Sequence, residues 1–324
     1  MKIHLLALDK VFDTGLATLL DTLAIANQLA EAHAISAPRF EVSVLGLRRR
    51  VHTGHGFRVP VTPAESAGRA DVMLAPGLGA ITPQTLAESL LRSEVKDATA
   101  LLRERVGEGA LAGAACTGTF LLADTALLNG LSATTTWWLA PLFRERFPQV
   151  ELDESRMLIS SGGFVTAGAA MAHLDLALWL VRRSSPDLAS ITARYLLGDV
   201  RSSQAAYVIP DHLAHNDPVV ERFERWARKR LAEGTSRGFS LSDAAQAIGS
   251  SGRTLARRLQ AVLGKTPLSY FQDLRVERAV HLLQTSKASV DQIARRVGYA
   301  DGTTLRALLR DKLGRGVREL RKNV

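Results

Sequence analysis

Two patterns of hydrophobic and polar residues divide the chain near residue 185. Before it, short apolar runs that do not alternate with polar residues are separated by segments with apolar residues every three or four positions. Unalternating runs are typical of strands buried on both faces of a parallel sheet. The first half is therefore predicted to be an α/β domain with a parallel sheet. The expected strands are Ile3–Leu8, Phe40–Leu47, Val72–Ala75, Ala110–Ala115 and Met157–Ser160, with Phe164–Thr166 as hairpin partner of the last.

Helical patterns fill the intervals between these strands. Parallel strands need such crossover connections, because each chain segment must return to the same end of the sheet. The expected helices are Thr14–His33, Pro83–Val106, Thr117–Leu127, Trp137–Phe147 and Ala169–Arg182.

The second half carries helical patterns, and one of them occurs twice. Leu241–Leu259 and Val290–Leu309 each place an alanine four positions before a glycine, and two leucines four apart after a short polar turn. The alanine lets two helices cross closely, Gly249 or Gly298 ends the first helix in a left-handed conformation, and the leucines attach the second helix to the core. The sequence therefore predicts an all-α C-terminal domain with two helix-turn-helix motifs.

Basic residues occupy the free face of the second helix in the first copy. Arg253, Arg257 and Arg258 point away from the leucines there. A helix-turn-helix with arginines on its second helix is the usual reader of a DNA major groove. A small helical bundle with a basic surface is the simpler alternative, and the duplication counts against it.

The charge of the chain is divided unequally. Of 41 Lys and Arg and 32 Asp and Glu, residues 1–185 hold 17 basic and 18 acidic, a net of −1, and residues 186–324 hold 24 and 14, a net of +10. A segregated basic domain indicates a polyanionic partner, here double-stranded DNA. A membrane partner is not expected, because the helices are not basic amphipathic ribbons with bulky aromatic faces.

Three domains or segments are expected. Residues 1–185 form a sensor or dimerisation domain, and residues 218–324 form the DNA-binding domain. The segment 186–217 connects them and is too apolar to be disordered, so it is expected to pack on the N-terminal domain or on a second subunit. A long helix from Pro267 through Leu283 would hold the two motifs at a fixed separation, so that both enter successive major grooves on one DNA face.

Composition limits the compartment and the cofactors. The single cysteine, Cys116, excludes an internal disulfide framework, and the first residues resemble neither a signal peptide nor a membrane span, so a cytoplasmic location is expected. His4, His33, His52 and His55 show no paired metal-binding spacing with the cysteine. No metal and no other cofactor is expected.

Candidate chemistry lies at two strand ends, where ligands bind to parallel sheets. Gly77 and Gly79 follow the strand Val72–Ala75 and are expected to free backbone N–H groups for a ligand. Cys116 follows a strand of tiny residues and precedes a helix, as in a nucleophile elbow, and a helix N-terminus lowers the pKa of a thiol. A small buried residue at a strand–helix corner is an equally good interpretation.

The residues around these points resemble known families. The Ala-Cys-Thr-Gly elbow, LLADTALLNGLSATTTWW and FPQVELDESRMLISSGGFVTAGAAMAHLDLALWLV resemble the ThiJ/PfpI superfamily, flavodoxin-like relatives of class I glutamine amidotransferases. RTLARRLQAVLGKTPLSYFQDLRVERAVHLL and IARRVGYADGTTL resemble the AraC/XylS family. Together they resemble GlxA-type transcriptional regulators, which join these domains in this order. The resemblance implies a flavodoxin-like N-terminal fold and a sequence-specific, DNA-binding regulator.

The sequence departs from the families at informative positions. Thr136 stands where many relatives have a histidine, so Cys116 lacks an evident base and no catalytic residue is expected. His173 cannot be placed near the cysteine from the sequence, and a structural role is the favoured interpretation. Leu305 and Leu309 replace phenylalanines of the last motif, and leucine fills similar space.

A small-molecule effector is expected to bind in the N-terminal domain and to shift the relative placement of the DNA-binding domains in a homodimer. Asp13 follows the first strand, where superfamily members often place an acidic group near the cysteine, although it could simply cap the next helix. A cysteine-dependent hydrolase or amidotransferase-like enzyme with a DNA-binding appendage is the alternative, and a ligand-free dimerisation scaffold is a third. The ligand-binding candidates are Asp13, Gly77, Cys116, Thr117 and Thr136.

The base-reading positions follow by analogy with the AraC/XylS family. In the first copy they are Gly252, Arg253, Ala256 and Arg257, and two arginines can each contact guanine in a bidentate manner. In the second copy, the position that corresponds to Arg257 holds no arginine, so the first copy's helix is expected to dominate base recognition. The candidates in the second copy are Thr303, Thr304 and Arg306, the last as a phosphate contact.

Overall fold

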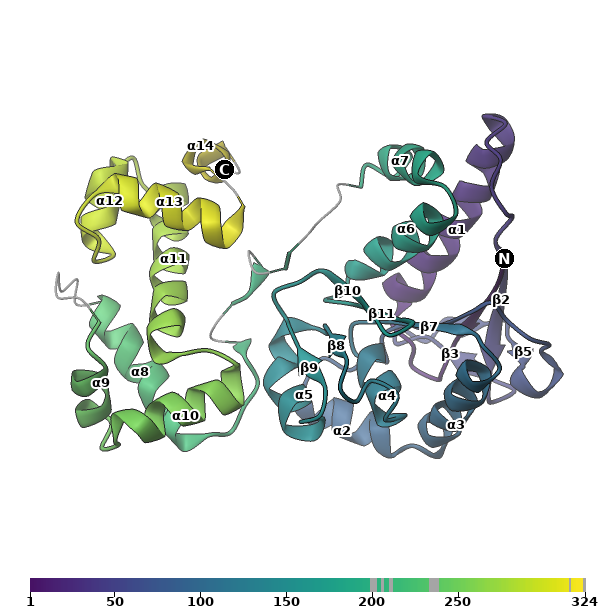
Figure 1. Ribbon diagram of the computed structural model, residues 1–324, viewed down its shortest axis with the longest axis horizontal. Helices are drawn as coiled ribbons and strands as arrows, with labels where there is room; N and C mark the ends of the chain where they lie inside the picture. Colours follow the sequence, from purple (N-terminus) through teal and green to yellow (C-terminus); the bar gives the residue numbers. More distant parts are fainter. Residues whose placement is uncertain (199–202, 205–206, 210–211, 233–238, 315, 323–324) are drawn as a thin grey trace. The chain divides into compact units, whose positions relative to one another are not determined.

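The computed structural model describes residues 1–198, 203–204, 207–209, 212–232, 239–314 and 316–322 (Figure 1). The chain forms two compact units, Met1–Gln204 and Ala205–Val324. The first is an α/β domain and the second, in its described part, is built from helices alone. Both fold classes agree with the prediction.

A seven-stranded sheet forms the centre of the first unit. The strand order is β10-β11-β7-β6-β1-β2-β5, and all neighbours are parallel except the hairpin of β10 and β11. The middle five strands have the flavodoxin-like order, in which the chain reverses direction across the sheet after β2. The strands are β1 (Lys2–Leu6), β2 (Glu41–Gly46), β5 (Thr62–Pro63), β6 (Val72–Ala75), β7 (Leu111–Ala115), β10 (Leu158–Ser161) and β11 (Phe164–Ala167).

Helices cover both faces of this sheet. One group, α1, α6 and α7, packs together on one face, and α2 to α5 lie on the other (Figure 1). The core between α1, α6 and the sheet is aliphatic, with Leu5, Leu74 and Val165 fully buried, because the parallel strands are covered on both sides. The helices are α1 (Asp13–Ala32), α2 (Pro83–Leu91), α3 (Ser93–Gly107), α4 (Gly118–Asp124), α5 (Ala140–Arg146), α6 (Ala172–Ser184) and α7 (Pro186–Tyr195).

Several elements differ from the sequence prediction. The helix expected over Pro83–Val106 is two helices, because Arg92 adopts an extended conformation between them. The helix expected from Trp137 begins as a short 3-10 turn, η2 (Trp137–Leu139). The shortest elements carry too few residues to show a period in the sequence. They are β3 (Val51–His52), β4 (Arg58–Val59), β8 (Ser132–Ala133), β9 (Glu151–Leu152) and η1 (Ala64–Ser66).

The first unit continues past the expected boundary at residue 185. Helix α7, placed by the prediction in the connecting segment, packs against α1 and α6 and begins at a cap, since the Ser185 hydroxyl accepts from Leu188 N–H. Gln204 is buried in the same unit, where its amide donates to Thr135 O at 2.9 Å and accepts from Ala169 N–H at 3.1 Å. The apolar connecting segment therefore packs on the N-terminal domain over residues 186–195.

The second unit contains two hydrophobic cores arranged along one long helix, α11. The first core includes Phe223, Leu255 and Leu259, and the second includes Leu305 and Leu309, all with no exposed surface. The leucines thus fill the second core as expected. The helices are α8 (Pro218–Ala232), α9 (Leu241–Ala247), α10 (Gly252–Leu263), α11 (Pro267–Thr285), α12 (Val290–Arg296), α13 (Gly302–Leu313) and α14 (Val317–Lys322).

Both helix-turn-helix motifs have the predicted local geometry. Gly249 and Gly298 end α9 and α12 with φ of +65° and +86°, a conformation in which a side chain would be strained. Ala245 and Ala294 are buried at the helix crossings, with 3% and no exposed surface. The sequence duplication is therefore a structural duplication.

Candidate functional site

Cys116 lies in a strained turn between β7 and α4. Its φ is +56°, unusual for a residue with a side chain. The turn is possible because Gly118 approaches the end of β6, where a Cβ atom would lie 2.3 Å from Ala75 O. This close approach is the geometry of a nucleophile elbow, one of the two interpretations that the sequence leaves open.

The glycine loop after β6 makes its hydrogen bonds inside the protein. Gly77 N–H donates to His173 Nε2 at 3.1 Å, and Leu78 N–H donates to Thr117 Oγ1 at 2.8 Å. The expectation that this loop leaves its N–H groups free for a ligand is therefore wrong at these two positions. A ligand can bind to them only after the internal partners move away.

Burial opposes ionisation of the Cys116 thiol. Burial raises its pKa to about 11, although the neighbouring Thr117 and Thr136 favour the thiolate. Burial of this residue, which is 6% exposed, therefore outweighs the lowering of the thiol pKa expected at a helix N-terminus, and it favours the interpretation of Cys116 as a small buried residue at a strand–helix corner. The structure does bring Gly77, Cys116, Thr117 and Thr136 together at the ends of β6 and β7.

His173, which the sequence could not place, lies beside this site on α6. One ring nitrogen accepts from Gly77 N–H and the other donates to Ala170 O at 2.5 Å, so both are used by the neutral ring. Burial lowers the pKa of His173 to about 4. The ring packs against Gly15, where a Cβ atom would lie 2.5 Å from Nε2. These contacts support the structural role that the sequence interpretation favours.

Asp13 is held by a neighbouring hairpin. Its carboxylate accepts from His55 N–H at 3.2 Å and contacts His55 Nδ1 at 2.9 Å. Burial opposes ionisation, but hydrogen bonds from Thr53 and His55 outweigh it and lower the pKa of Asp13. Asp13 is the first residue of α1 and makes no capping hydrogen bond. The preceding residue, Phe12, donates its N–H to Gly77 O at 2.9 Å.

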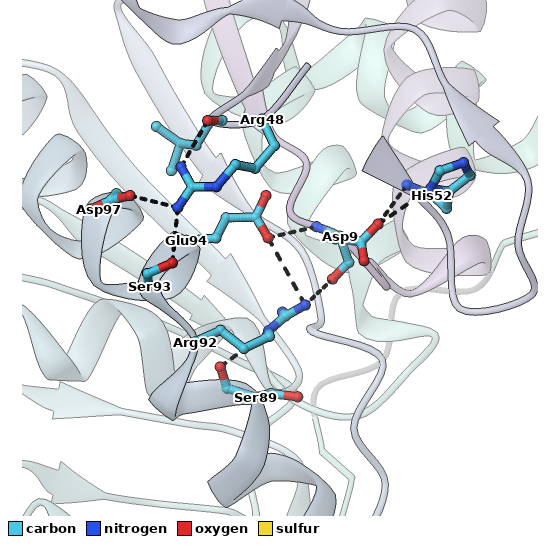
Figure 2. Close-up of polar contacts among 9 residues, drawn as sticks. Asp9, Arg48, His52, Ser89, Arg92, Ser93, Glu94 and Asp97 are labelled. Carbon is cyan, nitrogen blue, oxygen red and sulfur yellow. Dashed lines mark hydrogen bonds and ion pairs between the residues drawn. The ribbon is translucent and has the colours of Figure 1, made fainter. Parts of the chain in front are cut away.

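A polar network that the sequence did not reveal anchors the loop between β1 and α1 (Figure 2). Asp9 N–H donates to Glu94 Oε2 at 3.1 Å, Asp9 O accepts from Arg92 Nη1 at 2.6 Å, and Asp9 Oδ1 accepts from His52 N–H at 3.0 Å. Burial raises the pKa of Glu94. These residues come from three separate segments, so no sequence pattern links them. Arg92, the extended residue between α2 and α3, thus contacts this loop.

The DNA-reading candidates lie on exposed helix faces of the second unit. Arg253 and Arg257 are exposed on α10, with Gly252 and Ala256 half-buried beside them. Neither arginine has an ion-pair partner within the described residues. Arg258, which the prediction also placed on the free face, is instead paired with the buried Asp217 carboxylate.

The second helix-turn-helix presents a different surface. Thr303, Thr304 and Arg306 are exposed on α13. The Asp301 carboxylate caps this helix and accepts from Thr303 N–H at 2.7 Å and from Thr304 N–H at 2.8 Å. The corresponding cap of α10 is the neutral Ser251. An acidic cap weakens the attraction of a helix N-terminus for phosphate, so the two motifs are electrostatically unequal.

Two further observations limit the partners. Among the described residues, no group of three or more His, Cys, Asp and Glu side chains is arranged to hold a metal ion. No helix in the same part of the chain is long and apolar enough to cross a membrane.

Comparisons with known proteins agree with this architecture. A family model described as a helix-turn-helix domain matches residues 244–323. The HTH-type transcriptional regulator GbdR of Pseudomonas aeruginosa is 26% identical over 304 residues, covering 92% of this chain and 77% of that protein. The HTH-type transcriptional regulator GlxA of Rhizobium meliloti is 26% identical over 192 residues, 58% of each chain.

A solved structure supports the fold. The crystal structure of an AraC family transcriptional regulator from Pseudomonas putida is similar with a TM-score of 0.50 and 22% identity, over 60% of this chain and 98% of that one. At this identity the similarity bears on the fold alone.

The fold and the duplicated motif define a class: the chain is a two-domain transcriptional regulator with a helix-turn-helix DNA-binding domain. More narrowly, the chain is similar to the GlxA regulator, and it joins a flavodoxin-like α/β domain to a following helix-turn-helix domain.

The buried thiol leads to a first prediction. Cys116 should react with iodoacetamide at pH 8 roughly 100-fold more slowly in the native protein than in urea, because a pKa of about 11 leaves few thiolates. The rate is measured by mass spectrometry, and the chain in urea is the control. Native labelling as fast as in urea would contradict the buried, protonated thiol.

The buried histidine leads to a second prediction. The unfolded state binds a proton near pH 6.5 and the folded state only near 4, so stability falls as pH drops through this window. His173 should account for about 3 kcal/mol of the loss in the unfolding free energy of residues 1–204 between pH 7 and pH 4. In urea titrations, His173→Gln should remove this pH-dependent part of the unfolding free energy. His33→Gln, at an exposed position, should leave it unchanged.

Proposed function

We propose that this regulator reads DNA in a sequence-specific way, chiefly through α10. The observation that carries the proposal is the pair Arg253 and Arg257, exposed on one face of α10 and without intramolecular ion pairs in the described part of the chain. The opposite face is fixed by buried leucines, so the guanidinium groups are presented on a rigid element. Arginine in that setting can make bidentate contacts with guanine O6 and N7.

The second reading helix is proposed to contribute mainly to positioning. Ala307 stands on α13 where Arg257 stands on α10, and Arg306 is one residue earlier, about 100° around the helix. From there Arg306 suits a phosphate contact. The Asp301 carboxylate disfavours close approach of phosphates to the N-terminus of α13, which leaves the phosphate contact to Arg306 further along the helix.

The N-terminal domain is proposed to sense a small molecule and to bring two copies of the chain together. The candidates Gly77, Cys116, Thr117 and Thr136 gather at the carboxyl ends of β6 and β7, where ligands bind to sheets of this kind. Asp13, at the start of α1, is the fifth candidate. An effector binding to the Gly77 loop would compete with its bonds to His173 and Thr117, and so favour a second loop conformation.

The alternative is an enzyme that uses Cys116. Two observations favour the regulator without catalysis: burial raises the pKa of the thiol, and His173, which binds the Gly77 loop beside it, has both ring nitrogens engaged. A protein whose partner is DNA is also expected in the cytoplasm. Ligand-induced shifts in melting temperature would separate a sensor from a dimerisation scaffold, and turnover of amides that is lost in Cys116→Ser would establish the enzyme.

A third prediction tests DNA binding itself. Residues 205–324 should bind DNA that the full chain selects from a random pool, and residues 1–204 should not, because the excess positive charge lies in the C-terminal part. The affinity of the C-terminal fragment should fall steeply with salt, since phosphate contacts release counterions. Titrations at several salt concentrations measure both. Equal binding by the two fragments would reject the proposal, as would an affinity independent of salt.

A fourth prediction separates the two reading helices. Arg257→Ala should weaken binding to the selected site by roughly 1–3 kcal/mol and relax base preference at one position. Arg306→Ala should weaken binding evenly across sequences, as the loss of a phosphate contact does. Both variants are titrated against the selected site and its single-base variants. Loss of a base preference in Arg306→Ala, with every preference kept in Arg257→Ala, would show that α13 dominates.

A further inference from the structure

The two helix-turn-helix motifs share one helix but have separate cores. The first half of α11 supplies Tyr270, Phe271 and Leu274 to the first core, and its second half supplies Val276 and Ala279 to the second. Hydrophobic packing therefore holds each motif to its own part of α11. The junction between the two halves carries polar contacts to both motifs.

Asp273 lies at this junction and binds both motifs. Its Oδ2 atom is 2.9 Å from Lys265 Nζ, and its Oδ1 atom is 3.0 Å from Lys312 Nζ. Lys265 follows Gly264, the residue that ends α10, and Lys312 lies in the last turn of α13. One carboxylate thus connects the ends of both reading helices through the helix between them. The three side chains are only 19–29% exposed, so the pairs are partly shielded from water and salt.

Arg275 makes a second connection two residues further along α11. Its guanidinium lies 4.8 Å from the Phe271 ring centroid, in the first core, and 5.1 Å from that of Tyr299, in the turn of the second motif. The side chain is 7% exposed, and Gly298 leaves the room for it, because a Cβ atom there would lie 2.8 Å from Arg275 Nη2. The second turn is therefore packed directly on α11.

We propose that Asp273 is a positioning residue that fixes the relation between the two reading helices and thereby the spacing of the two DNA segments that the protein accepts. The inference rests on the proposed DNA reading by α10 and α13. A bridge from one carboxylate to both motifs restricts rotation of the second motif about α11. One added base pair displaces the second segment by about 3.4 Å and rotates it by about 34°, which a rigid pair of helices cannot follow.

The test uses the full chain and the DNA that it selects from a random pool. Binding is measured to that DNA and to versions with one base pair inserted or deleted between the two protected segments. The wild-type protein should bind the altered spacings roughly tenfold or more weakly, a typical cost of a mismatched site. Asp273→Asn should keep most of the affinity for the selected spacing and reduce the spacing penalty to about threefold or less.

Matched variants separate positioning from a general loss of structure. Asp311→Asn removes the same charge from an exposed position beside Lys312 and should keep the full penalty. Asp273→Glu should restore the penalty at least in part, and Lys312→Met, which breaks only the bridge to α13, should reduce it as Asp273→Asn does. Lys312→Met also replaces Asp273→Asn as the deciding variant if thermal unfolding shows that Asp273→Asn does not fold.

The outcomes are distinguishable from a failure of the proposed function. If the wild-type chain selects no DNA, the DNA-reading proposal itself fails. If the wild type binds and discriminates spacing, but Asp273→Asn and Lys312→Met keep the full penalty, the positioning role is overturned. An equal loss of affinity at every spacing would also overturn it, because that result indicates a merely structural contribution.

Discussion

The N-terminal domain depends on how closely its backbone segments meet at the carboxyl ends of β6 and β7. Gly118 brings α4 against Ala75 O, and this approach forces Cys116 into the left-handed region of φ. The same crowding places His173 and Thr117 within hydrogen-bonding distance of the Gly77 loop. A region that looks like an open catalytic elbow in sequence is thus closed by its own hydrogen bonds, and the chemistry of the thiol follows from that closure.

Much of this architecture could be predicted from the sequence because it depends on local patterns. The strand Val72–Ala75 has the predicted bounds, and the helix Pro267–Thr285 starts at the predicted residue. The left-handed glycines of both motifs follow from their place after a helical pattern of apolar residues. The candidate site was harder to predict from the sequence. That Cys116, Thr117 and Gly77 lie together follows from strand ends in a parallel sheet, but the partner of Gly77 is His173, 96 residues later, and no spacing rule brings α6 to that point.

The remaining differences have the same physical origin. Arg258 looks like a DNA contact from its helical position, yet Asp217, 41 residues earlier, engages it. The interruption of the helix at Arg92 is decided by the loop at Asp9, which the sequence places far away. The spacing of apolar residues along the chain indicates which of them are buried. It does not indicate the partners of polar side chains, which come from distant segments of the sequence.

The closure of the elbow also bears on how copies of this chain associate. A disulfide between subunits requires an accessible thiolate on each, and Cys116 is buried and protonated. Two copies therefore cannot form a disulfide through Cys116 while the domain stays folded. If two copies associate as proposed, their association is non-covalent at this residue, and the paired fraction changes with the protein concentration.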